Sequence, residues 1–150
     1  MVPTDFKALV QRFYVLQTER VEAYRLFEEG HEAYLRTGPH YDFDHYRQLV
    51  HEITLAFCGM SNEVLEIKQR LQREHSRTDL AEHIDKLQEK EKQKLQLTAR
   101  LQLARQRAQD HPEDLSCEEQ IQHIRQEIIR NRGVLSDIMQ DFKYDSEESE

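Results

Sequence analysis

Histidine, carboxylate and phenol side chains crowd into residues 28–52, which read EEGHEAYLRTGPHYDFDHYRQLVHE. This segment holds four of the eight histidines and three of the six tyrosines of the chain. Imidazoles and carboxylates are the groups that bind a metal ion or transfer protons in acid–base catalysis. A metal site and a catalytic centre are therefore the two chemical hypotheses that the segment raises.

The spacing of these histidines argues against both hypotheses. His31, His40, His45 and His51 follow one another at intervals of 9, 5 and 6 residues, and no two form an i, i+4 pair. The sequence also lacks a G-x-S-x-G motif, a glycine-rich phosphate loop and a Ser/His/Asp arrangement suited to nucleophilic catalysis. We therefore predict no metal, no cofactor and no enzymatic activity, and we expect His31 to be a core or boundary residue.

Turn chemistry explains the same segment better. Gly38 stands where the left-handed residue after a helix is wanted, and Pro39 stops the helix. Asp42 or Asp44 would cap the following helix. If Asp42 is the cap, the tyrosines on either side of it at 41 and 46 occupy the two positions of a hydrophobic staple. We predict a helix end, a Gly-Pro turn and a helix start.

Apolar residues recur every three or four positions along most of the chain, which predicts long amphipathic helices at about 5–36, 44–74, 79–109 and 117–142. Short polar connections favour antiparallel neighbours. We therefore predict an all-α fold, either an elongated antiparallel helical bundle or a set of coiled-coil hairpins. Residues 1–142 would form this single domain, and the acidic tail 143–150, KYDSEESE, is predicted to be disordered when free.

Polar residues beside these expected helices predict where the helices begin. Thr4 is the expected cap of the first helix, and Ser76 or Thr78 is the expected cap of the third. Ser116 and Glu119 have the spacing of a capping box at the start of the fourth helix.

The third expected helix carries a row of cations. Lys86, Lys90 and Lys94 are spaced i, i+4, i+8 and could follow a line of phosphates or an acidic protein surface. The full candidate set for polyanion contact is Lys86, Lys90, Lys94, Arg100, Arg105 and Arg107. Residues 111–150 hold eleven acidic and four basic residues, so pairing within the chain is the alternative.

The same helix carries leucines on more than one face, at Leu95, Leu97, Leu101 and Leu103. Because a bundle helix normally buries one face, the second apolar face suggests a protein partner or self-association through this helix.

Two polar residues and a glycine interrupt the apolar seams. Arg20 and Asn131 lie in the seams and predict a polar layer that sets the register of the helices at some cost in stability. Gly30 lies inside the first helix, where glycine costs roughly 1 kcal/mol relative to alanine. A close approach of another helix or partner at Gly30 would explain it.

The totals place limits on the class of protein. The chain has 150 residues, which favours one domain, and a formal net charge of −8 with a pI near 5.5 argues against a generally basic nucleic-acid binder. Its two cysteines form no disulfide framework. We expect no signal peptide and no membrane span, and hence a soluble intracellular protein of the nucleus, the cytoplasm or both.

Several short motifs resemble those of a known family. Between Leu9 and Phe57 the chain contains LVQR, LQ-x-ER, EEGH-x-x-YL, GP-x-YDF-x-x-YR and VHE-x-T-x-AF, and residues 135–150 are similar too. These pieces resemble the "required for excision 1-B" domain family, and the resemblance implies a role in DNA excision repair. The family brings no catalytic motif. Because its signature concentrates at the predicted turn, we predict an interaction surface there, with Tyr41 and Phe43 as apolar anchors; its residues are Gly38, Pro39, Tyr41, Asp42 and Phe43.

Three functional hypotheses remain open. The first is a non-enzymatic helical adaptor that works with protein partners in a DNA-repair complex and contacts DNA only indirectly. The second is a structural component of a microtubule-based, ciliary or axonemal assembly, since many members of the resembled family come from ciliated organisms. The third is direct nucleic-acid binding through the basic row.

Overall fold

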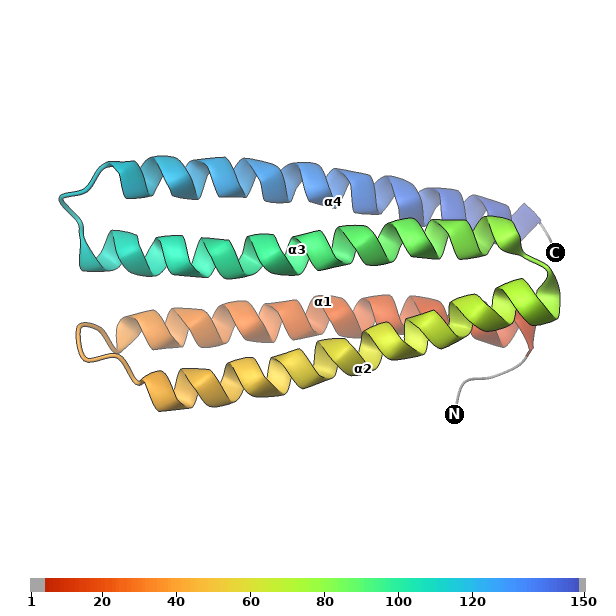
Figure 1. Ribbon diagram of the computed structural model, residues 1–150, viewed down its shortest axis with the longest axis horizontal. Helices are drawn as coiled ribbons and strands as arrows, with labels where there is room; N and C mark the ends of the chain where they lie inside the picture. The colour runs from red at the N-terminus through yellow and green to blue at the C-terminus, as the bar shows by residue number, and fades with distance from the viewer. Residues whose placement is uncertain (1–4, 149–150) are drawn as a thin grey trace.

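The protein folds as four long antiparallel helices. The computed structural model describes residues 5–148, and the helices are α1 (Phe6–Arg36), α2 (Phe43–His75), α3 (Thr78–Asp110) and α4 (Ser116–Glu148). They run side by side as an elongated molecule, with α3 between α4 and the α1–α2 hairpin (Figure 1). The predicted all-α helical bundle of four long helices is confirmed.

Aspartates cap the first two helices. The Asp5 carboxylate accepts a hydrogen bond from the backbone N–H of Ala8 at 3.2 Å, and the Asp42 carboxylate accepts one from the backbone N–H of His45 at 3.3 Å. Each of these bonds satisfies a donor that the first turn of a helix leaves free. Asp42 rather than Asp44 is thus the cap of α2, while Thr4 lies outside the described residues.

The predicted caps of α3 and α4 were wrong. Ser76 ends α2 in the left-handed conformation, with φ 55°, and Thr78 is already the first residue of α3. The start of α4 is held by Asp114, whose Oδ1 accepts hydrogen bonds from the Ser116 backbone N–H at 3.0 Å and from its Oγ at 2.6 Å. Ser116 is therefore a donor to the preceding turn and not the cap itself.

The acidic tail is also different from the prediction. The helix α4 continues to Glu148, so residues 143–148 are helical and not a disordered tail. Basic side chains near the start of α3 hold this end: Arg77 donates to the Asp145 carbonyl at 3.0 Å, and His83 Nε2 lies 2.7 Å from an Asp145 carboxylate oxygen. Ser146 is buried there. Contacts with α3 thus order a segment whose composition alone predicts disorder.

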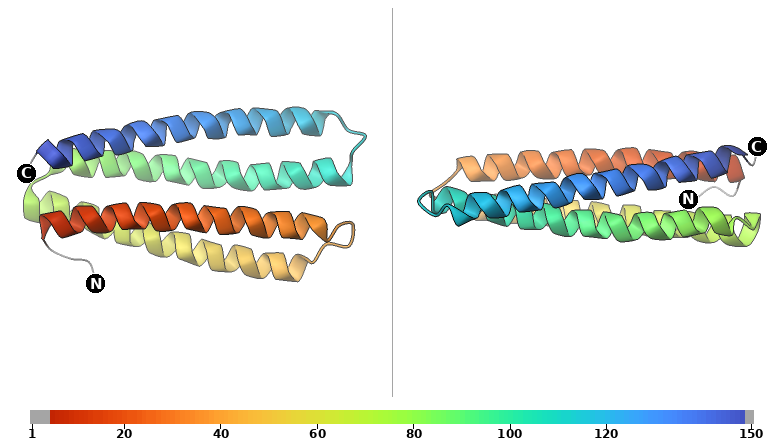
Figure 2. Two further views of the ribbon diagram at one scale, coloured as in Figure 1. Left: turned by 180° about the vertical axis from the view of Figure 1, so that it is seen from behind. Right: turned by 90° about the horizontal axis from the view of Figure 1, so that it is seen from above.

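All four helices share one core at the end where α1 begins and α4 ends. The buried members of this core are Leu9, Phe13, Leu16, Val64, Ile67, Leu71, Leu80, Ile84, Leu87, Leu135, Ile138 and Phe142. The rings of Phe13 on α1 and Phe142 on α4 lie 4.5 Å apart. Seen from above, α4 lies beside α3 at its start and runs toward α1 at its end (Figure 2).

Beyond this shared core the bundle divides into two helix pairs. One cluster joins α1 and α2 through Ala23, Tyr24, Phe27, Ile53 and Phe57. Another joins α3 and α4 through Leu97, Ala104, Ile121 and Ile124. Because α3 packs against both pairs, it needs two apolar faces: Leu95 contacts the first cluster, and Leu97 and Leu101 belong to the second. Leu103 is left 59% exposed.

A polar layer marks the level at which the bundle divides. Arg20 is 3% exposed and donates to Gln17 and Gln88 at 3.2 Å and to Ser61 at 3.4 Å. On α4, Asn131 Nδ2 donates to the carbonyl of Lys90 at 3.0 Å. The seam residues predicted to form a polar layer thus lie buried between the shared core and the two separate clusters.

Three glycines inside helices provide a test of packing. A Cβ on Gly30 would overlap the Leu49 side chain of α2, whereas a Cβ on Gly59 or Gly133 would meet nothing within 4 Å. We expect Gly59→Ala and Gly133→Ala each to raise the free energy of unfolding by about 0.5–1 kcal/mol, because alanine favours helix. Gly30→Ala should give no such gain, since Leu49 must move. Urea denaturation of the three variants measures this, and an equal gain in all three would contradict the close approach at Gly30.

Candidate functional site

A stack of tyrosines forms the tip of the α1–α2 hairpin. The Tyr34 ring lies between those of Tyr41, at 4.9 Å, and Tyr46, at 4.4 Å, and the His31 ring lies 5.7 Å from that of Tyr46. The predicted staple between Tyr41 and Tyr46 is therefore built through a third ring. Of the four histidines of this segment, His31 packs against the tyrosine rings, whereas His40, His45 and His51 are exposed.

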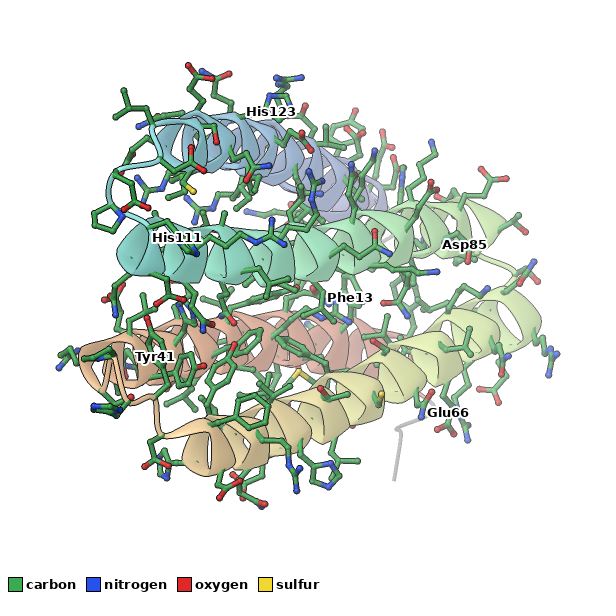
Figure 3. All side chains as sticks on the ribbon, turned by 60° about the vertical axis from the view of Figure 1, so that its left-hand side comes forward. Phe13, Tyr41, Glu66, Asp85, His111 and His123 are labelled. Carbon is green, nitrogen blue, oxygen red and sulfur yellow. The ribbon has the colours of Figure 1, made fainter. Side chains whose placement is uncertain are left out.

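The tip of the α1–α2 hairpin is hydrogen-bonded to the end of α3, and Tyr41 takes part in these bonds. Its hydroxyl donates to Asp110 at 2.5 Å, and Gln109 Nε2 donates to the Leu35 carbonyl at 2.6 Å. Tyr41 and the α3–α4 turn lie at the same end of the molecule (Figure 3). Tyr41 is thus engaged within the chain, and Phe43, which is 57% exposed, is the anchor residue that remains available at the tip.

Gly38 is not left-handed, so that prediction was wrong. No described glycine has a positive φ, and the C-cap of α1, Thr37, has φ −81°. The peptide bond between Gly38 and Pro39 is cis. A Cβ on Gly38 would come within 2.6 Å of Gln109 Nε2 and 3.0 Å of the Tyr41 ring. The Gln109 side chain of α3 and the Tyr41 ring therefore crowd a Cβ at Gly38, while the backbone conformation does not demand glycine.

The three lysines of the predicted basic row do not share one solvent face. Lys86 is exposed, while Lys94 is half-buried with its Nζ 4.2 Å from the centre of the Tyr24 ring. Burial lowers the pKa of Lys94. Lys90 Nζ donates to Gln93 at 3.4 Å. Lys86 is thus open to solvent, whereas Lys94 is partly covered by Tyr24.

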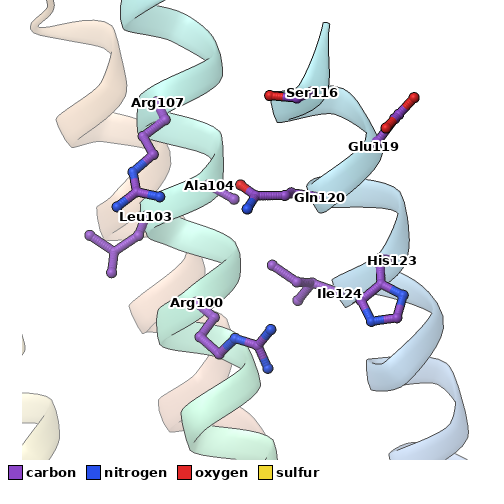
Figure 4. Close-up of a pocket in the computed structure, with 9 residues that line it drawn as sticks. All are labelled: Arg100, Leu103, Ala104, Arg107, Ser116, Glu119, Gln120, His123 and Ile124. Atoms are coloured by element: carbon purple, nitrogen blue, oxygen red, sulfur yellow. The ribbon is translucent and has the colours of Figure 1, made fainter. Parts of the chain in front are cut away.

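The arginines of the same candidate set are partly neutralised within the chain. Arg105 forms an ion pair with Glu32 of α1, and Arg100 lies 3.8 Å from Glu127 of α4. Arg100 and Arg107 line a shallow cleft of about 440 Å³ between α3 and α4, which is drawn in Figure 4. Pairing with the acidic C-terminal segment, the alternative to polyanion contact, thus occurs for Arg100.

A large hollow of the surface lies between α1 and α4, where the bundle divides. Two cavities of about 610 Å³ each follow one another there and share Arg25, Glu28, Lys94 and Arg132. We call them together the α1–α4 groove. It is lined by Gln17, Arg20, Val21, Tyr24, Arg25, Glu28, Glu29, His31, Glu32, Leu87, Glu91, Lys94, Thr98, Leu101, Gln102, Arg105, Arg125, Ile128, Ile129, Arg132, Leu135, Ser136 and Met139.

Sequence reasoning missed this groove, although one signal was present. Ile129 falls beside the apolar stripe of α4, and Arg125 and Arg132 flank it three or four residues away. That pattern places an isoleucine and two arginines on a common side of the helix. The helix that faces this side of α4 is set by how the α1–α2 and α3–α4 pairs diverge. The local sequence pattern of α4 does not predict that arrangement.

The groove contains ionisable groups whose pKa values are shifted by burial. Arg20 Nε lies 3.9 Å from Glu91 Oε2, and burial raises the pKa of Glu91. His31 is 1% exposed, and its pKa is lowered to about 4, first by burial and then by the charge of Arg105. His31 is therefore neutral near pH 7, as its predicted place in the core requires.

The hydroxyl on the groove floor is not arranged as a nucleophile. Thr98 Oγ1 donates its hydrogen bond to the Lys94 carbonyl of its own helix at 2.8 Å. Among residues 5–148 no three histidine, cysteine or acidic side chains are placed to hold a metal ion. Over the same residues, none of the helices combines the length and hydropathy needed to cross a bilayer.

Comparison with known proteins identifies relatives along nearly the whole chain. The sequence model of the family described as DNA repair REX1-B matches residues 8–105. A "Required for excision 1-B domain-containing protein" of Bos taurus is 38% identical over 146 residues, which is 96% of this chain and 78% of the relative. One of Mus musculus is 34% identical over 142 residues, 95% of this chain and 82% of the relative. No solved structure matches.

Substitution at Gly38 tests the packing of the tip against α3. We expect Gly38→Val to lower the free energy of unfolding by about 1–3 kcal/mol, since the added methyl groups must displace Gln109 or Tyr41. His40→Ala removes an exposed loop side chain and should change it by less than about 0.5 kcal/mol. Thermal and urea unfolding give both values, and equal stability of the two variants would overturn the close approach of Gly38 and Gln109.

The buried histidine predicts a pH dependence of stability. Its folded pKa of about 4 lies below the ordinary histidine value near 6.5, so the unfolded chain takes up the proton first as the pH falls. Above about pH 6.5 the protonation of His31 does not reduce the free energy of unfolding. As the pH falls towards 4, the free energy of unfolding decreases by about 2–3 kcal/mol. His31→Leu should flatten this slope, while His51→Leu, at an exposed position, should keep it. Urea unfolding at pH 7 and pH 4.5 makes the comparison; identical slopes for wild type and His31→Leu would refute it.

Proposed function

Since this chain belongs to the DNA repair REX1-B family, we propose that it works as a non-enzymatic helical adaptor that joins protein partners in an excision-repair complex. The family supplies the association with DNA repair. The adaptor role is our inference from the surface of the bundle, and we propose the nucleus as its site of action because the family is associated with DNA repair.

The observation that carries the proposal is the open α1–α4 groove. A four-helix bundle normally closes its apolar core against solvent along its whole length. Here α1 and α4 share a core only at one end, and the groove exposes apolar side chains such as Ile129, which is 64% exposed. An exposed apolar surface with charged flanks is typical of a site for protein contact.

The chemistry of the groove supports the non-enzymatic part of the proposal. Among its hydroxyls, that of Thr98 donates to the backbone of its own helix, and its histidine, His31, is a neutral packed residue near pH 7. Nucleophilic catalysis needs a nucleophile within hydrogen-bond reach of a base. Binding is the function that these side chains favour.

The two alternatives differ in how well the surface suits them. Direct DNA binding is disfavoured because Lys94 faces Tyr24 and because Arg100 and Arg105 have carboxylate partners. The ciliary or axonemal alternative is compatible with an elongated bundle, and the partners that the protein binds in cells distinguish it from the repair proposal.

Affinity purification of the tagged chain with mass spectrometry tests the proposal. We expect proteins of DNA excision repair to be enriched over a tag-only control and to remain after nuclease digestion, because the contacts are between proteins. Enrichment of microtubule or axonemal proteins in their place would favour the alternative and reject the repair role.

A parallel measurement tests direct DNA contact. Mixed with labelled duplex and single-stranded DNA at about 50 mM salt, where phosphate contacts are strong, the purified chain should not bind measurably. Salt-dependent binding that is lost in the triple variant Lys86→Glu, Lys90→Glu, Lys94→Glu would show instead that α3 contacts DNA directly.

A further inference from the structure

We propose that the α1–α4 groove binds an amphipathic helix of an acidic protein partner, with carboxylates of that helix pairing with Arg125 and Arg132 of α4. This inference rests on the proposed adaptor function and specifies its surface and the chemistry of its partner. The shape, the apolar contacts, the charge and the buried polar atoms of the groove each support it.

The shape of the groove suits a helix. Its two cavities share four lining residues, so they form one trough, and its walls and floor come from three helices that run in parallel or antiparallel directions. An amphipathic helix that lies in such a trough contacts its walls with residues spaced three or four apart. Such an occupant would complete the helical packing that α1 and α4 leave open.

Apolar side chains are available on both walls. Val21 on α1 and Ile129 on α4 are each 64% exposed, and both line the groove. Leu101 on α3 and Ile128 on α4 are half-buried between them. A partner helix with one apolar face would cover all four of these residues at once.

The charge of the groove selects an acidic partner. Its lining contains six cations and four carboxylates, whereas the whole chain carries a net charge of −8. Glu29 and Glu32 are already paired, with Arg25 and Arg105. Arg125 and Arg132 are exposed on α4 and form no ion pair with any residue that the structure describes. An acidic flank of a partner helix would pair with them without competing with a carboxylate of the chain.

Buried polar atoms in the groove point to a ligand with polar groups as well. Five buried side-chain nitrogen and oxygen atoms among the described residues have no hydrogen-bond partner, and four of them belong to groove residues: Gln17, His31, Glu91 and Gln102. Gln102 is 6% exposed; its Oε1 accepts from Tyr46, while its Nε2 has no acceptor. Buried donors are normally satisfied, and a carboxylate or amide of a bound helix would supply an acceptor for Gln102 Nε2 once this side chain turns toward the groove.

The wall formed by α1 argues against a nucleic acid in this groove. Glu28, Glu29 and Glu32 stand along it, and a phosphate backbone carries charge along its whole length. An amphipathic helix can place its carboxylates on one flank only, toward α4. The groove therefore favours a protein helix over a polyanion.

A designed peptide tests the proposal and stands in for the natural partner. The probe is a fluorescent synthetic helix of about 18 residues with leucines spaced for one apolar face and glutamates on its flanks. Two comparison peptides carry lysine in place of glutamate, or the same residues in scrambled order. Fluorescence anisotropy with the full chain should show binding of the glutamate peptide, and weaker or no binding of the other two.

Matched variants locate the binding site. Arg132→Glu should weaken binding of the glutamate peptide by about tenfold or more, while Arg130→Glu, an exposed position of α4 outside the groove, should change it less than about twofold. Ile129→Ser should weaken it several-fold in comparison with Val134→Ser, also exposed and outside the groove. All four positions are on the surface, so thermal unfolding should show intact folding.

Defined outcomes would overturn the proposal. These are no binding of the glutamate peptide, equal binding of the lysine or scrambled peptide, or equal weakening by Arg132→Glu and Arg130→Glu. Sedimentation that reveals a dimer dissolved by Arg132→Glu would assign the groove to a second copy. Binding of a single-stranded oligonucleotide that Arg132→Glu abolishes would assign it to nucleic acid.

The result is separable from that of the proposed function. If repair proteins still co-purify with Arg132→Glu and the peptide does not bind, the groove assignment fails and the adaptor role stands. If the peptide binds with the expected variant pattern but no repair protein co-purifies, the groove assignment stands and the repair role fails.

Discussion

The burial of the Arg20 guanidinium determines where the four helices stop sharing one core. A buried charge must be surrounded by hydrogen-bond partners, because leaving it unpaired costs several kcal/mol. Arg20 takes these partners from its own helix, from α2 and from α3, through Gln17, Ser61 and Gln88. Polar groups therefore occupy the level at which apolar residues of α1 and α4 would otherwise meet. Beyond it each helix pair builds its own cluster, and the groove opens between them.

Because the bundle divides, α3 packs against helices on two sides, and its sequence predicts this only in part. It packs against α1 and α2 with Leu95 and against α4 with Leu97 and Leu101. Its second apolar face, which in the sequence suggests self-association, is occupied by a helix of the same chain. Two of its basic residues are also used within the chain, since Arg105 pairs with Glu32 of α1 and Arg100 lies beside Glu127 of α4. Features that suggest external partners for α3 alone are largely used inside the fold.

The sequence predicts the helices, which follow from a repeating apolar spacing. It does not predict features that depend on contacts between residues far apart in the chain. The four helices follow from apolar spacing, and their observed starts and ends lie within a few residues of the prediction, apart from the extension of α4 to Glu148. That extension needs Arg77 and His83, which meet Asp145 only after α3 and α4 have paired. Gly38 shows the same limit: its position after a helix predicts a left-handed turn, whereas the structure places it against the side chain of Gln109, at the far end of α3. The groove could likewise not be predicted from local sequence, because its two walls, α1 and α4, are the first and last helices of the chain.

The concentration of family motifs at the hairpin tip has a structural explanation that links it to the groove. The tyrosine stack and the bonds from Tyr41 to Asp110 and from Gln109 to Leu35 fix the end of α1 against the end of α3. Near the tip, Glu32 of α1 pairs with Arg105 of α3, on the wall and floor of the groove. These contacts hold α1 at a set distance from α3, while α4 is attached to α3 alone at this end. The tip residues therefore hold α1, one wall of the α1–α4 groove, in position. This role explains why the family motifs concentrate at the tip without requiring that these residues contact a partner.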